Sequence, residues 1–320
     1  MIILSLCFCQ LVEAQGFCFV ELNCENLFDT KHDTLKNDLD YTPEGTLRWT
    51  RSRYRRKLNS IAKEIIACGG EGEDWQKPDL VALVEVENDT VLHDLTRKSL
   101  LRNAHYDYVI TNSPDERGVD VALLYDSETI KIEQSRSIRI TPPKGGKPTR
   151  DILYSRCSMK QGEIHVFVVH SPSRAGGKKA TDNYRMIVAE RLCESIDSIR
   201  ENDKDASIIV AGDFNDYFTD PAPQKIIQHG MKNVSANVRG KNGAKGTYRF
   251  RGEWGSLDQI FMSEAMSSRC MIMECSICDA PFLTEEEPKY GGVRPRRTFH
   301  GPSYDGEGYS DHLPLVLKWK

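Results

Sequence analysis

Apolar and polar positions alternate along the chain in blocks that predict a layered α/β protein. Short apolar runs bounded by polar turns are typical of strands buried in a sheet. In residues 48–68 the apolar positions instead recur at helical spacing, with Leu58, Ile61 and Ile65 on one stripe. The pattern predicts strands over 17–23, 79–86, 119–125, 130–140, 151–159, 163–170, 256–262 and 270–278, one beginning at Ser207 and one closing the chain, and helices over 48–68, 90–101, 181–200 and 221–229.

Three segments carry more specific signals. Residues 130–140 alternate weakly, as expected of a strand at the edge of a sheet. Asp220 stands where it could cap the helix over 221–229. Residues 285–309 are rich in Gly, Pro and charge, which predicts a long loop.

Polar side chains stand at the ends of several apolar runs. The run that begins at Ser207 stops at Gly212 and then presents Asp213 and Asn215 at the expected tip of a core strand. A rigid strand with polar groups at its tip can carry a site, although a plain polar turn has the same composition. The polar groups found in this way are Asn23, Glu85, His170, Asp213, Asn215, Asp258, Asp311 and His312.

These eight residues suggest metal-assisted chemistry on a phosphate. Two imidazoles, four carboxylates and two amides, with no cysteine among them, suit a hard divalent cation such as Mg²⁺, Mn²⁺ or Ca²⁺. Attack of water on a phosphorus ester needs neutralised phosphoryl oxygens, a base for the water and stabilisation of the leaving oxygen. The same inventory supplies all three.

Composition narrows the function classes. The chain has 320 residues, 39% hydrophobic and 28% charged, which describes a globular protein with a large core. A net charge of −4 argues against a protein that coats long stretches of duplex DNA, although local clusters can still grip a few phosphates. No linker or repeat divides residues 15–320, so we expect one domain there.

The N-terminus and the cysteines bear on the compartment. Residues 1–14 are apolar and short, and Ala14 stands where a signal peptidase prefers a small residue. We therefore expect a signal peptide and a periplasmic or secreted protein; a buried first strand, and a cytoplasmic protein, is the alternative. Cys275-x-x-Cys278 has no second pair or nearby histidines, so no zinc site is expected, and the cysteine count does not settle the compartment.

Seven blocks, in order and nearly from end to end, carry a resemblance to a known family. The sequence resembles the endonuclease/exonuclease/phosphatase superfamily, with the deoxyribonuclease I-like fold, and within it a bacterial secreted-type member. This resemblance implies a four-layer sandwich of two mixed β-sheets packed face to face with helices outside. The blocks are LNCENLF (Leu22–Phe28), DLVALVEVEN (Asp79–Asn88), RGVDVALLY (Arg117–Tyr125), VVHSPS (Val168–Ser173), VAGDFND (Val210–Asp216), GSLDQIFM (Gly255–Met262) and YSDHLPL (Tyr309–Leu315).

The resemblance also implies a metal centre. Glu85 falls at the family's metal-binding glutamate, with Asn23 and Asp311 as further metal ligands or their neighbours. The implied cofactor is Mg²⁺, with Mn²⁺ or Ca²⁺ as alternatives. Two positions depart from the family pattern: Val84 stands where glutamine is frequent, and Ser256 where arginine or lysine is frequent.

The catalytic roles follow from the same correspondence. His312 matches the histidine that contacts the scissile phosphate and serves as base, and Asp258 matches the acid that orients it. Asp213 and Asn215 match the pair that positions the nucleophile and contacts the phosphate. His170 falls at the histidine that handles the leaving group.

A carboxylate on one imidazole nitrogen fixes the tautomer and raises the basicity of the other nitrogen. Asp258 would do this for His312, and Asp120 is the corresponding choice for His170.

The substrate is less well defined by the sequence. We expect a metal-dependent hydrolase of phosphodiester bonds that acts as a nuclease, as a monomer without a stable protein partner. The alternatives are a phosphoesterase for a phospholipid (sphingomyelinase-like) or for a small phosphate ester, and a non-catalytic binding module. The groups that could contact nucleic acid are the basic cluster Arg48, Arg51, Arg53, Arg55, Arg56 and Lys57, the later Arg294, Arg296 and Arg297, and the aromatic Tyr248, Phe250 and Trp254.

Overall fold

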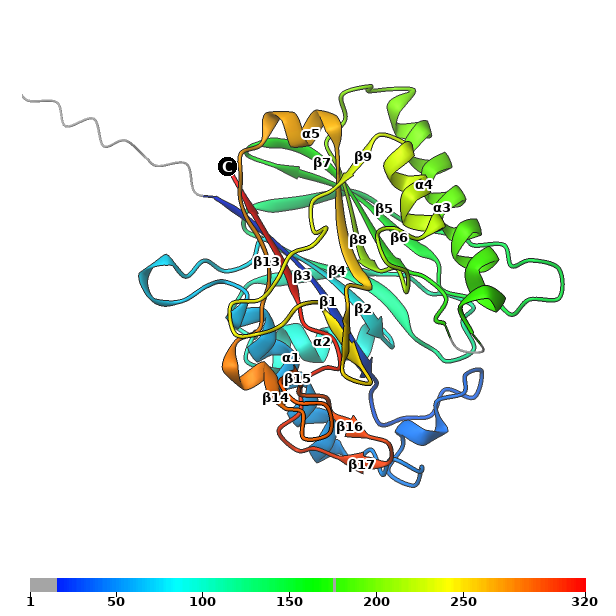
Figure 1. The fold of residues 1–320 in the computed structure, drawn as a ribbon, viewed down its shortest axis with the longest axis vertical. Coiled ribbons are helices and arrows are strands. Elements are labelled where there is room, and N and C mark those ends of the chain that lie inside the picture. Colours follow the sequence, from blue (N-terminus) through cyan, green and yellow to red (C-terminus); the bar gives the residue numbers. More distant parts are fainter. Residues whose placement is uncertain (1–15, 175–176) are drawn as a thin grey trace, which may run out of the picture.

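Two six-stranded sheets form the centre of the protein (Figure 1). The computed structural model describes residues 16–174 and 177–320, so the predicted signal peptide lies outside the described residues. The first sheet has the order β13-β18-β1-β2-β4-β3, and the second has the order β5-β6-β7-β8-β12-β9. Both sheets are mixed, because β1 runs parallel to β2 and β7 parallel to β8, whereas the other neighbours are antiparallel.

Except for β3 and β9, the strands of the two sheets correspond to runs expected from the sequence. The first sheet consists of β1 (Phe17–Leu27), β2 (Leu80–Val86), β3 (Tyr106–Ile110), β4 (Asp120–Asp126), β13 (Ile272–Ile277) and β18 (Leu315–Trp319). The second consists of β5 (Ile130–Ile138), β6 (Ile152–Met159), β7 (Gly162–His170), β8 (Ile208–Asp213), β9 (Met231–Asn233) and β12 (Asp258–Ser263).

Helices cover the outer faces of the two sheets. In Figure 1, α1 (Arg51–Ala67) and α2 (Asp89–Lys98) lie on one side, and α3 (Lys178–Arg200) and α4 (Pro221–Gln228) lie on the other. A short α5 (Glu264–Arg269) follows β12. The four-layer arrangement is the expected one. None of the helices in the described ranges combines the length and apolarity that crossing a membrane requires.

The alternation of side chains along each strand builds three apolar layers. On β1, Phe17 and Phe19 face the second sheet, whereas Cys18 and Val20 face α1 and α2. The central layer joins apolar residues of both sheets, and a third layer lies between the second sheet and α3 and α4. Because both faces of each sheet are covered, most strands are apolar throughout.

Several boundaries differ from the prediction for local reasons. Helix α1 begins at Arg51 because Thr50 caps it, accepting a hydrogen bond from the backbone N–H of Arg53. β3 was not expected, since it lies at the edge of its sheet and is only half-buried. β5 does lie at an edge, as predicted.

The prediction that the Asp220 side chain caps α4 is wrong. It makes no capping hydrogen bond to the helix. Its carboxylate instead binds Arg174 (2.9 Å) and Lys178 (2.6 Å), cations that draw it away from the helix end.

The segment expected to be a long loop contains small hairpins, visible at the bottom of Figure 1. Strands β14 (Thr284–Glu286) and β15 (Val293–Pro295) form one, and β16 (Phe299–His300) and β17 (Ser303–Tyr304) form the other. A further hairpin consists of β10 (Tyr248–Phe250) and β11 (Glu253–Gly255). Three short 3₁₀ turns complete the described elements: η1 (Leu39–Tyr41), η2 (Gly72–Asp74) and η3 (Pro281–Leu283).

Candidate active site

Strand register brings polar residues together at one end of the layer between the sheets. In the second sheet His170 lies opposite Asp213, and Asp213 lies opposite Asp258 on the next strand. Directly opposed residues point to the same face of a sheet. Val168, Ala211 and Ile260 lie two residues away on the same three strands and face the same way, into the apolar layer between the sheets. The polar cluster is thus the end of the central core.

The first sheet supplies the other half of the cluster. Asn23 follows Phe19 on the inward side of β1, and its Nδ2 donates to Asp213 Oδ2 at 3.2 Å. The segment before β18 lies beside it, because Ser310 Oγ donates to the backbone oxygen of Asn23 at 2.6 Å. Asp311 and His312 therefore arrive at the same end of the sandwich.

His312 and Asp258 form a buried pair. His312 Nδ1 lies 2.7 Å from Asp258 Oδ2, and the Thr247 hydroxyl donates to that same oxygen. The Tyr248 ring lies against the imidazole with 4.8 Å between ring centroids. Burial opposes protonation of His312, but the carboxylates of Asp258, Asp213 and Asp311 raise its pKa well above its usual value. With Nδ1 held by the carboxylate, Nε2 is the nitrogen left for chemistry.

Asp213 and Asn215 occupy a tight turn that only a particular backbone allows. Gly212 has φ of 143°, and a Cβ there would lie 1.8 Å from the Val169 carbonyl oxygen. Asn215 has φ of 52°, and its backbone N–H donates to Asp213 Oδ1 at 2.8 Å. Its side-chain Nδ2 donates to Asp213 Oδ2 at 3.2 Å and to the Ser171 carbonyl at 3.1 Å. Burial, and then the charge of Asp258, raise the pKa of Asp213 to about 7.

Glu85 reaches the site through a break in strand alternation. Val84 faces the central layer and Val86 faces the helices, so the residue between them shifts the alternation by one. Glu85 has φ of 60°, a conformation that L-residues adopt at functional positions at some cost. Its carboxylate accepts hydrogen bonds from the Asn26 backbone N–H at 3.0 Å and from Arg117 Nη2 at 3.3 Å.

His170 is buried beside both carboxylates. Its Nε2 lies 3.8 Å from Glu85 Oε1 and 3.8 Å from Asp213 Oδ2. Burial lowers its pKa well below the usual value, and the nearby Arg150 and Arg117 lower it further.

The expectation that Asp120 orients His170 is wrong. His170 Nδ1 has no hydrogen-bond partner within the described residues. Asp120 instead accepts from the Ser113 backbone N–H at 2.9 Å and from the hydroxyls of Ser113 and Thr111.

The oxygen donors of the site are of the kind that hard cations prefer, and the compact group in this cluster that could hold a metal is Asp213, Asp258 and His312. Asn23 and Glu85 offer amide and carboxylate oxygens, and Asp311 offers a carboxylate that Arg297 Nη2 holds at 2.6 Å. Glu21 lies nearby, fully buried, and neither of its carboxylate oxygens has a hydrogen-bond partner in the described part of the chain. Burial, followed by the charges of Asp258 and Asp213, raises the pKa of Glu21 well above its usual value. This accumulation of carboxyl groups favours a positive charge at the site.

The basic residues expected to contact nucleic acid divide into two groups. Lys57 is buried and donates to the hydroxyl of Thr298 at 2.7 Å and to the Tyr309 carbonyl. Arg53 donates to the Leu47 carbonyl at 2.6 Å. The exposed members that line a surface pocket of about 370 Å³ on α1 are Arg51, Arg55 and Arg56, together with Ser52 and Asn59.

The later arginines are engaged in ion pairs. Arg294 binds Glu285 at 2.7 Å, Arg296 binds Glu307 at 2.7 Å, and Arg297 binds Asp311. Glu285, His300 and Asp305 form a compact group that could also hold a metal. Two of its carboxylates are paired with these arginines, Glu285 with Arg294 and Asp305 with Arg296. The later arginines therefore balance charges inside the hairpin region.

Sequence reasoning missed two residues around the site, Arg117 and Thr247. Arg117 opens one of the seven blocks but had no role assigned, and it binds Glu85. Thr247 fixes Asp258, and no sequence signal marks it. Tyr248, one of three aromatic candidates for contact with a base or sugar, packs its ring against His312.

Fold and site together define a deoxyribonuclease I-like α/β sandwich with an acid–imidazole cluster at one end of its core. The sequence pattern described as Endonuclease/Exonuclease/phosphatase family matches residues 18–320. The chain belongs to this family. No curated protein matches it.

Solved structures share the fold across nearly the whole chain. A mannosyl-6-phosphatase from Bacteroides thetaiotaomicron is 17% identical, with a TM-score of 0.60, over 95% of this chain and 99% of that chain. An endonuclease/exonuclease/phosphatase family protein from the same organism is 15% identical, with a TM-score of 0.59, over 95% of both chains. TDP2 of D. rerio, solved with a single-strand DNA product, is 16% identical, with a TM-score of 0.55, over 95% of this chain and 99% of that chain. At these identities the likeness concerns the fold alone.

Proposed function

We propose that the protein is a divalent-metal-dependent phosphoesterase that hydrolyses phosphodiester bonds by in-line attack of water. The observation that carries this proposal is the buried His312–Asp258 pair, 2.7 Å apart, in a cluster that also holds Asp213 and His170. A carboxylate-bound imidazole is suited to proton transfer in the reaction. Membership of a family of endonucleases, exonucleases and phosphatases supports the same reaction class.

The cation in this proposal is Mg²⁺, or Mn²⁺ or Ca²⁺ in its place, held by Glu85 and Asn23 with Asp311. These residues offer oxygen donors, which hard divalent cations prefer. A bound cation of this kind neutralises charge on the phosphoryl oxygens. The φ of 60° at Glu85 supports a functional role, because a non-glycine residue keeps this conformation only where its surroundings enforce it.

The protein's own residues manage the protons. His312 Nε2 takes the proton of the attacking water, Asp258 fixes the imidazole, and Asp213 orients the water. Both N–H groups of the Asn215 amide are engaged with Asp213 and the Ser171 carbonyl, so Asn215 acts by holding Asp213 in place. His170, kept neutral by burial, donates to the leaving oxygen.

The electrostatics of the cluster bear on the choice of base. The carboxylates that surround His312 raise its pKa, so the neutral imidazole becomes available only at higher pH. Asp213, with a pKa of about 7, is the competing base at neutral pH. The substitution His312→Gln separates the two assignments, because it removes one base and leaves the other.

For the substrate we propose nucleic acid. The exposed Arg51, Arg55 and Arg56 on α1 offer positive charge for a phosphate backbone. Ion pairing of Arg294, Arg296 and Arg297 favours a second candidate, a small phosphate ester that needs fewer cationic contacts.

The test is a substrate panel in Mg²⁺, in Mn²⁺ and in excess EDTA. Plasmid DNA, single-stranded RNA, sphingomyelin vesicles and simple phosphate esters would be incubated with the full chain. We expect cleavage of nucleic acid that EDTA abolishes and added Mg²⁺ restores. Hydrolysis undiminished by chelator would refute the metal dependence, and cleavage of simple esters alone would favour the second candidate.

Glu85→Gln provides a matched control that does not depend on turnover. Mg²⁺ binding to the native state raises the thermal midpoint by mass action. We expect Mg²⁺ to raise the midpoint of the wild type but not that of Glu85→Gln. An equal rise in both proteins would place the cation elsewhere.

A further inference from the structure

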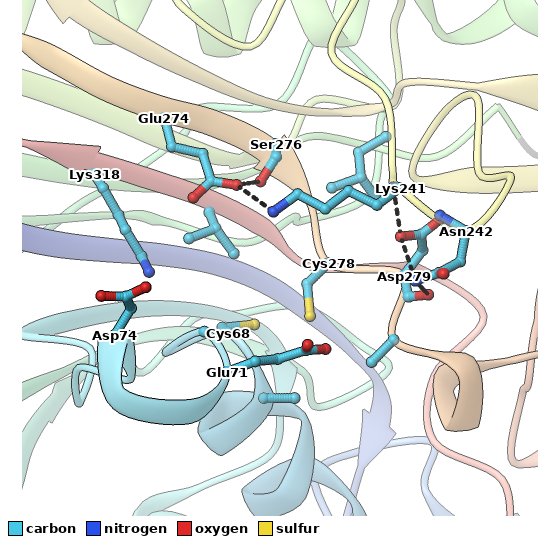
Figure 2. Close-up of a pocket in the computed structure, with 15 residues that line it drawn as sticks. Cys68, Glu71, Asp74, Lys241, Asn242, Glu274, Ser276, Cys278, Asp279 and Lys318 are labelled. Atoms are coloured by element: carbon cyan, nitrogen blue, oxygen red, sulfur yellow. Dashed lines mark hydrogen bonds and ion pairs between the residues drawn. The ribbon is translucent and has the colours of Figure 1, made fainter.

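A cavity of about 380 Å³ lies on the outer side of the first sheet, away from the residues of the candidate active site. Its walls come from the end of α1, the segment around η2, the edge strand β13 and its neighbour β18 (Figure 2). Cys68 and Cys278 lie in the middle of this lining. None of the eight predicted site residues lines it, so the proposed function leaves its chemistry unexplained.

The two thiols belong to segments that are far apart in the sequence and fixed in space. Cys68 caps the C-terminal end of α1, and its backbone N–H donates to the Glu64 carbonyl at 3.1 Å. Cys278 follows β13, and its N–H donates to the Pro314 carbonyl at 2.9 Å. Figure 2 shows the two sulfur atoms next to each other, one from each segment.

The thiols interact with each other and differ in character. Burial, and then a hydrogen bond to Cys278, raise the pKa of Cys68 well above its usual value. The same hydrogen bond is the main cause that lowers the pKa of Cys278, against the effect of its burial. Cys68 is buried, whereas Cys278 is partly exposed to the cavity. Cys278 is therefore the better nucleophile of the two and the more accessible one.

Lys241, Lys318 and Asp279 beside the cavity have protein partners, whereas Glu71 and Asp74 are exposed at its rim. Lys241 lies 3.5 Å from Glu274, and Lys318 Nζ donates to the Gly69 carbonyl at 2.9 Å. Asp279 accepts from the backbone N–H groups of Lys241 and Asn242. Within residues 16–174 and 177–320, the compact groups of three or more metal-type ligands include neither cysteine. The dithiol itself is thus the reactive feature of the cavity.

We propose that Cys68 and Cys278 form a reversible disulfide that joins the end of α1 to the β13–β18 edge of the first sheet. The oxidant is a small disulfide such as glutathione disulfide. The Cys278 thiolate attacks one of its sulfurs, that S–S bond breaks, and one glutathione leaves as a thiolate and takes up a proton. Cys68 gives its proton to solvent, and its sulfur attacks Cys278 Sγ and displaces the second glutathione. Two protein thiols are oxidised and one glutathione disulfide is reduced.

A cross-link between these positions encloses most of the chain, so it restricts the unfolded state more than the native one. Oxidation is therefore expected to raise the thermal midpoint. Cys68 and Cys278 line the same cavity, so the cross-link joins two segments that already meet there.

The experiment is a redox titration of the purified full chain in glutathione buffers of varied ratio. Free thiols would be blocked in acid, and non-reduced peptides mapped by mass spectrometry. We expect one cross-linked peptide pair containing Cys68 and Cys278, formed and reversed as the glutathione ratio changes, with a higher thermal midpoint in the oxidised form.

Variants separate this pair from its neighbours. Cys68→Ser and Cys278→Ser are each expected to abolish the cross-link and the rise in thermal midpoint. Cys275→Ser is the matched control and should keep both effects. Cys275 lies three residues before Cys278 and packs against the layer between the sheets, whereas Cys278 packs against the apolar layers on both faces of the first sheet and lines the cavity.

The wild-type peptide map decides the matter even if a variant fails to fold. Independent glutathionylation of the two cysteines, or a link from either one to Cys18 or Cys275, would overturn the proposal. So would protection of both thiols by added Zn²⁺ with no cross-link at any glutathione ratio, which would indicate a metal site instead.

Discussion

The substitution Asp258→Asn tests the proposed catalytic pair most directly. It keeps the shape of the side chain but removes the charge that lies 2.7 Å from His312 Nδ1. Hydrogen bonds that involve a charged group contribute about 1.5–3 kcal/mol, against about 1 kcal/mol for neutral ones. Asn keeps a neutral hydrogen bond, so the change costs about 0.5–2 kcal/mol, which at about 1.4 kcal/mol per tenfold change in rate lowers kcat roughly 2- to 30-fold. His312→Ala removes acid–base catalysis by this residue altogether, so we expect it to lower kcat more, by about 10²- to 10⁴-fold.

The pH dependence of Asp258→Asn has a definite sign. The Asp258 carboxylate raises the pKa of His312, so removing its charge lowers that pKa. If His312 must be neutral to act, the rising limb of the kcat profile moves to lower pH. The assay is steady-state hydrolysis of a chromogenic phosphodiester from acid to alkaline pH at saturating Mg²⁺. A kcat within about twofold of wild type together with an unmoved limb would refute the reasoning, because it would mean that removing the charge costs less than about 0.5 kcal/mol.

His312→Gln distinguishes the two candidate bases. The rising limb disappears if His312 is the base. If Asp213 is the base, a limb remains and moves to higher pH, because the charge of His312 lowers the pKa of Asp213 and is now absent. Circular dichroism of the variant provides the folding control.

Three further predictions concern stability and binding. Gly212→Ala should destabilise the protein by at least about 3 kcal/mol in urea unfolding, because its Cβ would overlap the Val169 carbonyl, whereas Gly145→Ala, at an open position, should cost far less. Glu64 is buried without hydrogen-bond partners for its carboxylate oxygens, and burial raises its pKa well above the usual value. The wild type therefore loses stability as pH rises from about 4.3 through that raised pKa. Glu64→Leu should remove this loss and stabilise the protein by about 1–3 kcal/mol at pH 8 but not at pH 4, and equal effects at both pH values would contradict it. If nucleic acid is the substrate, changing Arg51, Arg55 and Arg56 to Gln should reduce the slope of log affinity against log salt by about one for each phosphate that is no longer neutralised, and an unchanged slope would favour a small ester.

Much of the site could be predicted because it continues the pattern that forms the core. Asn23 stands four residues after the inward-facing Phe19 on β1, and Asp213 stands two after Ala211 on β8. His170 and Asp258 have the same relation to Val168 and Ile260. Since alternate residues on a strand share a face, reading each apolar run past its end predicts that these polar groups face one another. The expected fold and the expected strand ends were confirmed for the same reason.

Other parts of the site depend on structure that alternation does not encode. Glu85 reaches the cluster only because a left-handed residue shifts the register of β2, and a period of two cannot reveal such a shift. Alternation also does not predict which side chains pair with each other. Asp120 was chosen as the partner of His170 on chemistry alone, but it accepts hydrogen bonds from Thr111 and Ser113. Nor could alternation show that Arg297, a candidate nucleic-acid contact, pairs with Asp311 and Glu25.

The position of the site at the end of the core links its chemistry to stability. The alternation that buries Phe17 and Phe19 on β1 also buries Glu21, which has no hydrogen-bond partner among the described residues. Together with Asp213 and Asp258, it makes negative charge costly and positive charge favourable in a region from which water is largely excluded. That environment raises the pKa of both His312 and Asp213 and so favours their protonated forms. A cation bound there would lower the pKa of both groups, so metal affinity, native-state stability and the pH at which the catalytic groups ionise should change together when any one of these carboxylates is replaced.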